Sequence, residues 1–164
     1  MGIRKIGVGL VVVGLAGLVA TTAFAEGFTW PVSGTITATH VYAGGAYHSG
    51  SADIGAPYWR GIGASHRGWT YARWESGGCG YYVSMSHGNG YTSLYCHMVR
   101  WPSTWNGRYV YRNTHIGYVG STGHSTGPHV HFAIRRWGVR YRIPNIWRGK
   151  WVNRGYICAY YAGV

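Results

Sequence analysis

The sequence predicts an all-β protein, and three observations lead to this prediction. No segment of ten residues carries the three-to-four-residue apolar repeat of an amphipathic helix. Strong helix formers are scarce, since Lys and Glu contribute only one and two residues after position 25. Short alternating runs are common instead, as in GYYVSMSHGNGYTSLYCHM at 80–98. No linker, repeat or composition shift divides the chain after residue 25, so one β domain is expected there.

The first 25 residues are expected to be a secretory signal peptide and to lie outside this domain. Arg4 and Lys5 precede a 15-residue apolar run, and Ala23-Phe24-Ala25 forms a cleavage site of the A-x-A type. The apolar run is short for a membrane span, although an uncleaved anchor is the alternative. The expected boundaries are therefore 1–25 for the signal peptide and 26–164 for the domain.

Charge narrows the choice of partners and mechanisms. Residues 26–164 keep 13 Lys and Arg and all three acids, a formal charge of +10. This charge favours an anionic partner, such as a cell-wall polymer or an anionic envelope surface. Nucleic acid is not expected in an exported protein. The acids, Glu26, Asp53 and Glu75, are a thin basis for a carboxylate pair, and neither HExxH nor G-x-S-x-G occurs.

A hairpin is expected within 80–98. Asn89-Gly90 is the dipeptide of a tight β-turn, and the alternating runs on either side can pair across it. Centring the turn near Gly88-Asn89 places Cys96 opposite about Tyr81, one pleat from Cys79. A Cys79–Cys96 disulfide would then form after a small register shift or bulge, in the oxidising compartment that export implies. Two unpaired thiols are the alternative, and Cys158 has no evident partner.

Histidines carry the chemistry that the acids cannot. The run PHVHFAIR predicts a strand in which His129 and His131 share one face, after a loop at 122–128. His48 precedes Asp53 by five positions, and His97 follows Cys96. Two imidazoles and one carboxylate suit a zinc ion with a water in its fourth position. Taken singly, each of these residues is more often a loop, surface or core residue than a ligand.

Three blocks together resemble a known family. HSGSADIGAP, SHGNGYTSLYCHM and IGYVGSTGHSTGPHVHFAIR are similar, in order, to the signature blocks of the lysostaphin/LytM-type zinc metallopeptidases, which cut peptide bonds in bacterial peptidoglycan. The similarity runs from about residue 30 to 146. It implies the family fold, a compact antiparallel β-sheet core (a duplicated hybrid motif) with a groove walled by loops.

The resemblance also implies a role for each residue. His48, Asp53 and His131 would be the zinc ligands, with one Zn²⁺ per chain. His97 and His129 would be the catalytic histidines. One of these two would help to deprotonate the attacking water, while the other would stabilise the oxyanion or protonate the leaving amine. Which histidine does which is left open.

The expected function is therefore that of an exported zinc endopeptidase acting on peptidoglycan stem peptides or cross-bridges. It would be a monomer, secreted, wall-associated or periplasmic. One alternative is an inactive LytM-like protein that binds cell wall or activates another hydrolase. Another is a basic, aromatic-rich polymer-binding module with no enzymatic role.

The remaining histidines and the many aromatic residues receive simpler interpretations. His87, in the hairpin block, is expected to make a structural hydrogen bond. The excess of Trp and Tyr is expected either to fill the core or to line the rim of a groove for glycan and peptide. The other histidines are expected in loops or at the surface: His40, His66, His115 and His124.

Overall fold

The all-β prediction is confirmed. The computed structural model describes residues 27–39 and 50–160. All elements of regular secondary structure in these ranges are β-strands. Their bounds are β1 Gly27–Thr29, β2 Gly34–Thr39, β3 Ser51–Gly55, β4 Gly61–Gly63, β5 Gly68–Glu75, β6 Gly80–Gly88, β7 Tyr91–Met98, β8 Arg108–Val110, β9 His115–Tyr118, β10 His129–Arg136, β11 Val139–Arg140, β12 Trp151–Val152 and β13 Ile157–Tyr160. Within the same ranges, no helix has the length and apolarity needed to cross a membrane.

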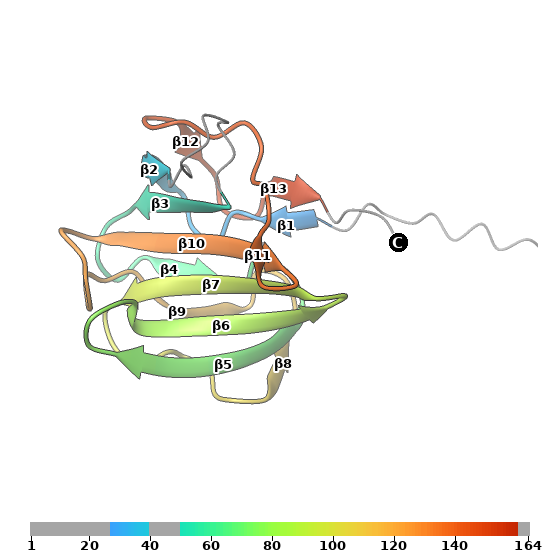
Figure 1. The fold of residues 1–164 in the computed structure, drawn as a ribbon. Coiled ribbons are helices and arrows are strands. Elements are labelled where there is room, and N and C mark those ends of the chain that lie inside the picture. The colour runs from blue at the N-terminus through green and yellow to red at the C-terminus, as the bar shows by residue number, and fades with distance from the viewer. Residues whose placement is uncertain (1–26, 40–49, 161–164) are drawn as a thin grey trace, which may run out of the picture.

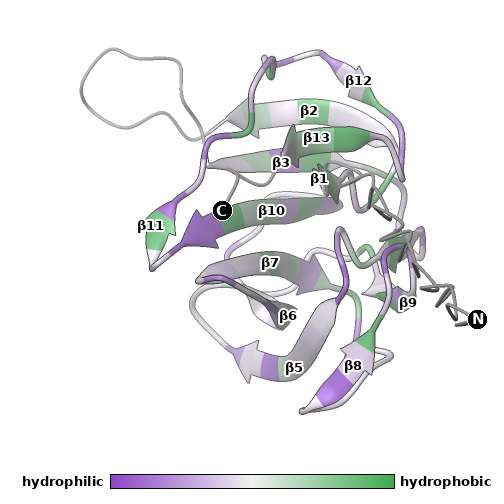
Figure 2. Cartoon of the chain, turned by 90° about the vertical axis from the view of Figure 1, so that its right-hand side faces the viewer, coloured by the Kyte–Doolittle hydropathy of each residue, from purple (hydrophilic) through white to green (hydrophobic). Residues whose placement is uncertain are grey.

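One large antiparallel sheet organises the molecule. Its strands follow the order β12-β2-β3-β10-β7-β6-β5-β8, and β11 pairs with β10. Figure 1 shows β10 between β3 and β7, although these strands come from distant parts of the chain. Figure 2, turned by 90°, shows the same sheet running from β12 and β2 at one edge to β8 at the other. Two small sheets, β1-β13 and β4-β9, complete the fold.

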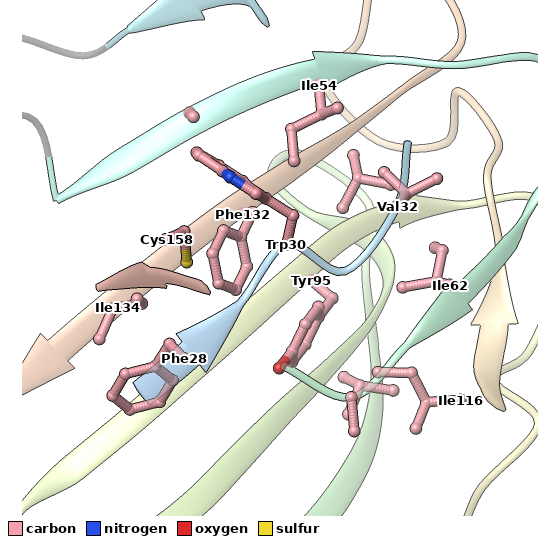
Figure 3. Packing of buried hydrophobic residues seen from close by; sticks show 14 of the residues in the cluster. Phe28, Trp30, Val32, Ile54, Ile62, Tyr95, Ile116, Phe132, Ile134 and Cys158 are labelled. Carbon is pink, nitrogen blue, oxygen red and sulfur yellow. The ribbon is translucent and has the colours of Figure 1, made fainter. Parts of the chain in front are cut away.

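The core lies on one face of the large sheet, which we call the inner face. Phe132 of β10 and Tyr95 of β7 are fully buried, and their rings pack 5.5 Å apart. Figure 3 shows Phe28 and Trp30 from the N-terminal segment, and Ile62 from β4, packed in the same cluster as these two rings. Because side chains alternate along a strand, burying this set turns the intervening residues to the opposite, outer face.

The predicted hairpin is present as β6 and β7. Gly88 pairs with Tyr91, which leaves the two-residue loop Asn89-Gly90 with φ values of 48° and 73°. Both values are positive, as a type I′ turn requires, and Asn and Gly tolerate this backbone conformation best.

The Cys79–Cys96 disulfide is also present. The expected register was wrong by two positions, because Tyr81 pairs with Met98 rather than with Cys96. The register shifts between this pair and the next, Val83–Tyr95. A register shift or bulge of this kind was expected to accompany the disulfide. Cys158 is a buried free thiol, and burial raises its pKa well above the usual range.

Candidate active site

Asp53 and His131 are brought together by the pairing of β3 and β10. The two residues are direct cross-strand partners, so both side chains leave the same face of the sheet. Their neighbours Ile54 and Val130 are fully buried on the inner face, which places Asp53 and His131 on the outer face. The Nδ1 atom of His131 lies 2.7 Å from Oδ1 of Asp53.

A β-bulge aims His97 toward this pair. Between the register positions Val83–Tyr95 and Tyr81–Met98, β7 has one residue more than β6. His97 lies in that bulge with φ of 65°, a left-handed conformation that a β-strand does not adopt. Its N–H donates a hydrogen bond of 2.7 Å to the carbonyl of Cys79, whose disulfide holds the neighbouring Cys96. The bulge, the hydrogen bond and the disulfide together fix the position of His97.

The imidazoles of His97 and His129 are held in the same way. Nδ1 of His97 lies 2.8 Å from the carbonyl oxygen of Thr122, and Nδ1 of His129 lies 2.8 Å from that of Gly127. A carbonyl oxygen can only accept, so both Nδ1 atoms donate and a neutral ring carries its lone pair on Nε2. The two rings lie 4.6 Å apart, and that of His97 lies 6.4 Å from that of His131.

Burial favours the neutral form of His97. The side chain is 7% exposed, and desolvation lowers its pKa, with a smaller contribution from the neighbouring His129 and His131. The hydrogen bond to Thr122 and the charge of Asp53 oppose this shift. At neutral pH the ring is therefore able to accept a proton at Nε2.

These residues surround one cavity of about 460 Å³. One wall is the turn between β5 and β6, where Oε1 of Glu75 accepts a hydrogen bond of 2.6 Å from the N–H of Cys79. The loop before β10 forms another part of the wall. The described lining residues are Asp53, Glu75, Gly77, Gly78, Cys79, His97, His124, Ser125, Thr126, His129 and His131. Trp and Tyr do not occur among them, so the described lining does not bear out an aromatic groove wall.

The donor set at this cavity fits a zinc ion as far as the structure describes it. A carboxylate oxygen and an imidazole nitrogen converge on the outer face, with side-chain exposures of 16% for Asp53 and 20% for His131. These are donors that zinc prefers, at a partly exposed place where a substrate could reach them. Residues 27–39 and 50–160 contain no group of three side chains able to hold a metal. The third expected ligand, His48, lies outside the described residues.

The structure therefore gathers four of the five expected site residues: Asp53, His97, His129 and His131. His40 lies outside the described residues, as does His48. His124 is exposed at the cavity wall, and His66 lies in the loop between β4 and β5, as expected, although it is only 2% exposed. It packs against Phe28 in the core, with its ring 5.3 Å from that of Phe28. His115 begins strand β9 and is half-buried.

Sequence reasoning missed the groups that orient the histidines. The carbonyls of Thr122 and Gly127 do so through the backbone, which no side-chain pattern reveals. Ser125 adds a hydroxyl 3.3 Å from Nδ1 of His129. The one available signal was the Gly- and Ser-rich composition of 122–128, which predicts a loop but not its hydrogen bonds. The structural hydrogen bond expected for His87 is confirmed, since Nδ1 lies 2.7 Å from the carbonyl of Arg67.

Comparisons with known proteins find related sequences and folds. The sequence model of Peptidase family M23 matches residues 46–144, which include the five expected site residues. Over 83 residues the chain is 38% identical to the DD-carboxypeptidase/endopeptidase Mpg of Neisseria meningitidis serogroup B. That match covers 51% of this chain and 19% of the relative, so the chain spans about a fifth of the length of the curated relatives it matches.

Solved structures share the fold. A zinc-containing peptidase from Vibrio cholerae has a TM-score of 0.62 at 22% identity, covering 72% of this chain and 39% of that one. The catalytic domain of the prophage-encoded M23 protein EnpA from Enterococcus faecalis gives 0.55 at 28% identity, with coverages of 81% and 92%. The catalytic domain of lysostaphin from Staphylococcus simulans gives 0.51 at 26% identity, with coverages of 65% and 80%.

Proposed function

The chain belongs to peptidase family M23, and on that premise we propose that it is an exported, zinc-dependent endopeptidase that hydrolyses peptide bonds in bacterial peptidoglycan. One observation carries most of the proposal. The rings of His97 and His129 both have Nδ1 tied to a backbone carbonyl, beside the pair formed by Asp53 and His131. A binding protein without catalysis would have no need to orient two imidazoles in this way.

Asp53 and His131 would hold the zinc ion, together with His48. Bound there, zinc would lower the pKa of a water and polarise the carbonyl of the scissile bond. Nε2 of one auxiliary histidine, His97 or His129, would take a proton from the attacking water. The other would hydrogen-bond the developing oxyanion or protonate the leaving amine. His97 is the more shielded of the two rings, and the bulge of β7 keeps it from turning away.

Sequence and disulfide chemistry support export. Residues 1–25 have the pattern of a signal peptide, and a disulfide between Cys79 and Cys96 persists in oxidising compartments outside the cytosol. Cleavage after Ala25 would begin the mature protein at Glu26. N-terminal sequencing of protein recovered from the envelope or medium of the producing cells tests this, and a chain still starting at Met1 in the cytosol would contradict it.

The test of the enzyme is zinc content measured together with lysis. The mature protein should contain about one zinc per chain and should clear a suspension of purified peptidoglycan until a chelator is added. Asp53→Ala should lose both zinc and lysis. His97→Gln should keep zinc and lose lysis, because its target is proton transfer and not metal binding.

Two results would point elsewhere. Wild-type protein with neither zinc nor lysis would favour the inactive wall-binding or hydrolase-activating alternative. Lysis by an Asp53→Ala protein would overturn the metal assignment.

A further inference from the structure

A strip of aromatic side chains lies on the outer face of the sheet near its β8 edge. We call Trp69, Tyr71, Tyr109 and Tyr111 the aromatic strip. Gly68, Thr70 and Ala72 of β5 are buried, so alternation turns Trp69 and Tyr71 outward. Trp69, Tyr109 and Tyr111 are 49%, 41% and 72% exposed.

Three rings of the strip are packed against one another: those of Trp69, Tyr109 and Tyr111. Trp69 and Tyr109 are direct cross-strand partners with ring centroids 5.2 Å apart, and Tyr109 and Tyr111 lie 5.7 Å apart. Both pairs are edge-to-face, at 74° and 86°. Such contacts order the rings before any ligand arrives, which lowers the entropic cost of binding. Exposed aromatic rings that are packed against one another, and not into a core, are typical of a binding surface.

The strip continues from the candidate active site. Beyond Tyr71, the outward positions of β5 are Arg73 and Glu75, and Glu75 lines the cavity. Arg73 lies with its guanidinium carbon 6.0 Å from the ring centroid of Tyr71. At about 3.3 Å per residue, Trp69 and Glu75 are about 20 Å apart along the strand. A polymer reaching from the cavity to Trp69 would therefore follow one strand.

The far end of the strip is cationic. A second cavity, of about 200 Å³, is lined by His66, Arg67, Tyr111 and Arg112. Its two guanidinium groups suit carboxylate or phosphate groups, and an aromatic ring completes the wall. The two acids of the described residues, Asp53 and Glu75, are both at the other end, beside the first cavity. The charge along the strip thus favours an anionic ligand at the β8 edge.

We propose that the aromatic strip and the second cavity bind an acidic polysaccharide strand, with sugar rings against the aromatic faces and acid groups at Arg67 and Arg112. The identity of that strand rests on the proposed function, under which it is the wall glycan, whose acid groups are free on the sugars that carry no stem peptide. The strip would then fix the polymer about 20 Å from the scissile bond and favour cross-linked wall over free peptide.

The composition of the face favours a polysaccharide over a lipid surface. Each aromatic member is Trp or Tyr, with a polar group at its tip, and the neighbouring outward positions opposite Tyr71 and Trp69 are Ser84 and Ser86 of β6. A sugar ring offers apolar C–H groups to an aromatic face and hydroxyls to such neighbours. The two serines interrupt the face with hydroxyl groups, whereas insertion into a bilayer favours a continuous apolar face.

Direct binding to glycan tests the proposal without using hydrolysis. The probe is glycan strands freed of their stem peptides, and affinity is measured by titration calorimetry with the mature protein. The double variant Trp69→Ala/Tyr109→Ala should bind about tenfold or more weakly. The matched control is Trp151→Ala, since Trp151 is 60% exposed on β12 at the opposite edge of the same sheet. It should bind as wild type does.

A neutral probe separates the two parts of the site. Arg112→Gln should weaken binding of the acidic strands severalfold and reduce its dependence on salt, yet leave binding of a neutral oligomer of N-acetylglucosamine unchanged. The double aromatic variant should weaken binding of both probes. Thermal unfolding of each variant checks that the fold is kept.

The outcomes distinguish this proposal from the proposed function. Glycan binding through the strip in a protein that cuts no peptide would uphold the strip and refute the endopeptidase. Wall hydrolysis by a protein whose double variant binds glycan like wild type would refute the strip alone. Binding to vesicles of phosphatidylglycerol with no binding to glycan would overturn the polysaccharide in favour of a lipid surface.

Discussion

Protonation of His87 should destabilise the folded protein at mildly acidic pH. Nδ1 of this ring lies 2.7 Å from the carbonyl oxygen of Arg67, and Nε2 lies 2.7 Å from the hydroxyl of Ser93. The ring also packs edge-on against Phe28 at 5.1 Å. Burial lowers the pKa of His87 to about 4, repulsion from His66 contributes, and the hydrogen bond to Arg67 opposes the shift.

The direction and size of the effect follow from linkage. The unfolded chain binds a proton at His87 near pH 6.5, whereas the folded protein binds it only near pH 4. Between these values the unfolded state holds more protons, so stability falls as pH falls. From pH 8 to pH 5, His87 alone should cost about 2 kcal/mol of unfolding free energy, approaching about 3 kcal/mol below pH 4.

Urea denaturation at pH 8 and pH 5 measures this loss. His87→Gln keeps a group that can donate and accept but does not titrate, so its loss between the two pH values should be about 2 kcal/mol smaller than that of wild type. The exposed His124 provides the control, since His124→Gln should follow wild type. Burial also lowers the pKa of His97 and His115, so some pH dependence should remain in every protein. Equal losses for wild type and His87→Gln would refute the reasoning.

Three further predictions concern the framework of the site and the surface charge. Cys79→Ser with Cys96→Ser opens a bridge between residues 17 apart and should cost about 3 kcal/mol in urea denaturation; unchanged stability would show that the disulfide has no such role. Gly80→Ala should lower the free energy of unfolding by at least about 1 kcal/mol, because Gly80 has φ of 64°. It should also lower the rate of lysis, because a Cβ there would meet Thr122, whose carbonyl holds His97. A variant as stable and active as wild type would contradict this. The rate on anionic walls should fall severalfold between about 0.05 M and 0.5 M salt, because salt screens the attraction of a basic protein to its substrate, and a rate indifferent to salt would assign the charge another purpose.

Local patterns predicted much of the fold. The two-residue alternation predicted the paired strands within 80–98, and Asn89-Gly90 marked the turn between them correctly. Both signals depend on neighbours a few residues away, so they can be read from one stretch of chain. The disulfide could be predicted because its two cysteines lie on either side of that turn.

The site was predicted as a set of residues, without the contacts that arrange them. A resemblance to known blocks named Asp53, His97, His129 and His131, and the structure brings these four together around one cavity. No sequence signal predicted that the carbonyls of Thr122 and Gly127 orient His97 and His129. The burial of His66 was also missed, because a polar residue in a loop-like stretch is usually exposed.

The sequence by itself determined which side chains share a face of one strand, as it does for His129 and His131, because alternation is a property of the extended backbone. Only the tertiary structure decided that Asp53 meets His131, since this depends on the register between strands 78 residues apart. The bulge that aims His97, and the packing of Trp69 against Tyr109, likewise arise from pairing with distant strands. Such pairings are selected by the burial of the whole inner face, so they emerge only when the sheet and its core form together.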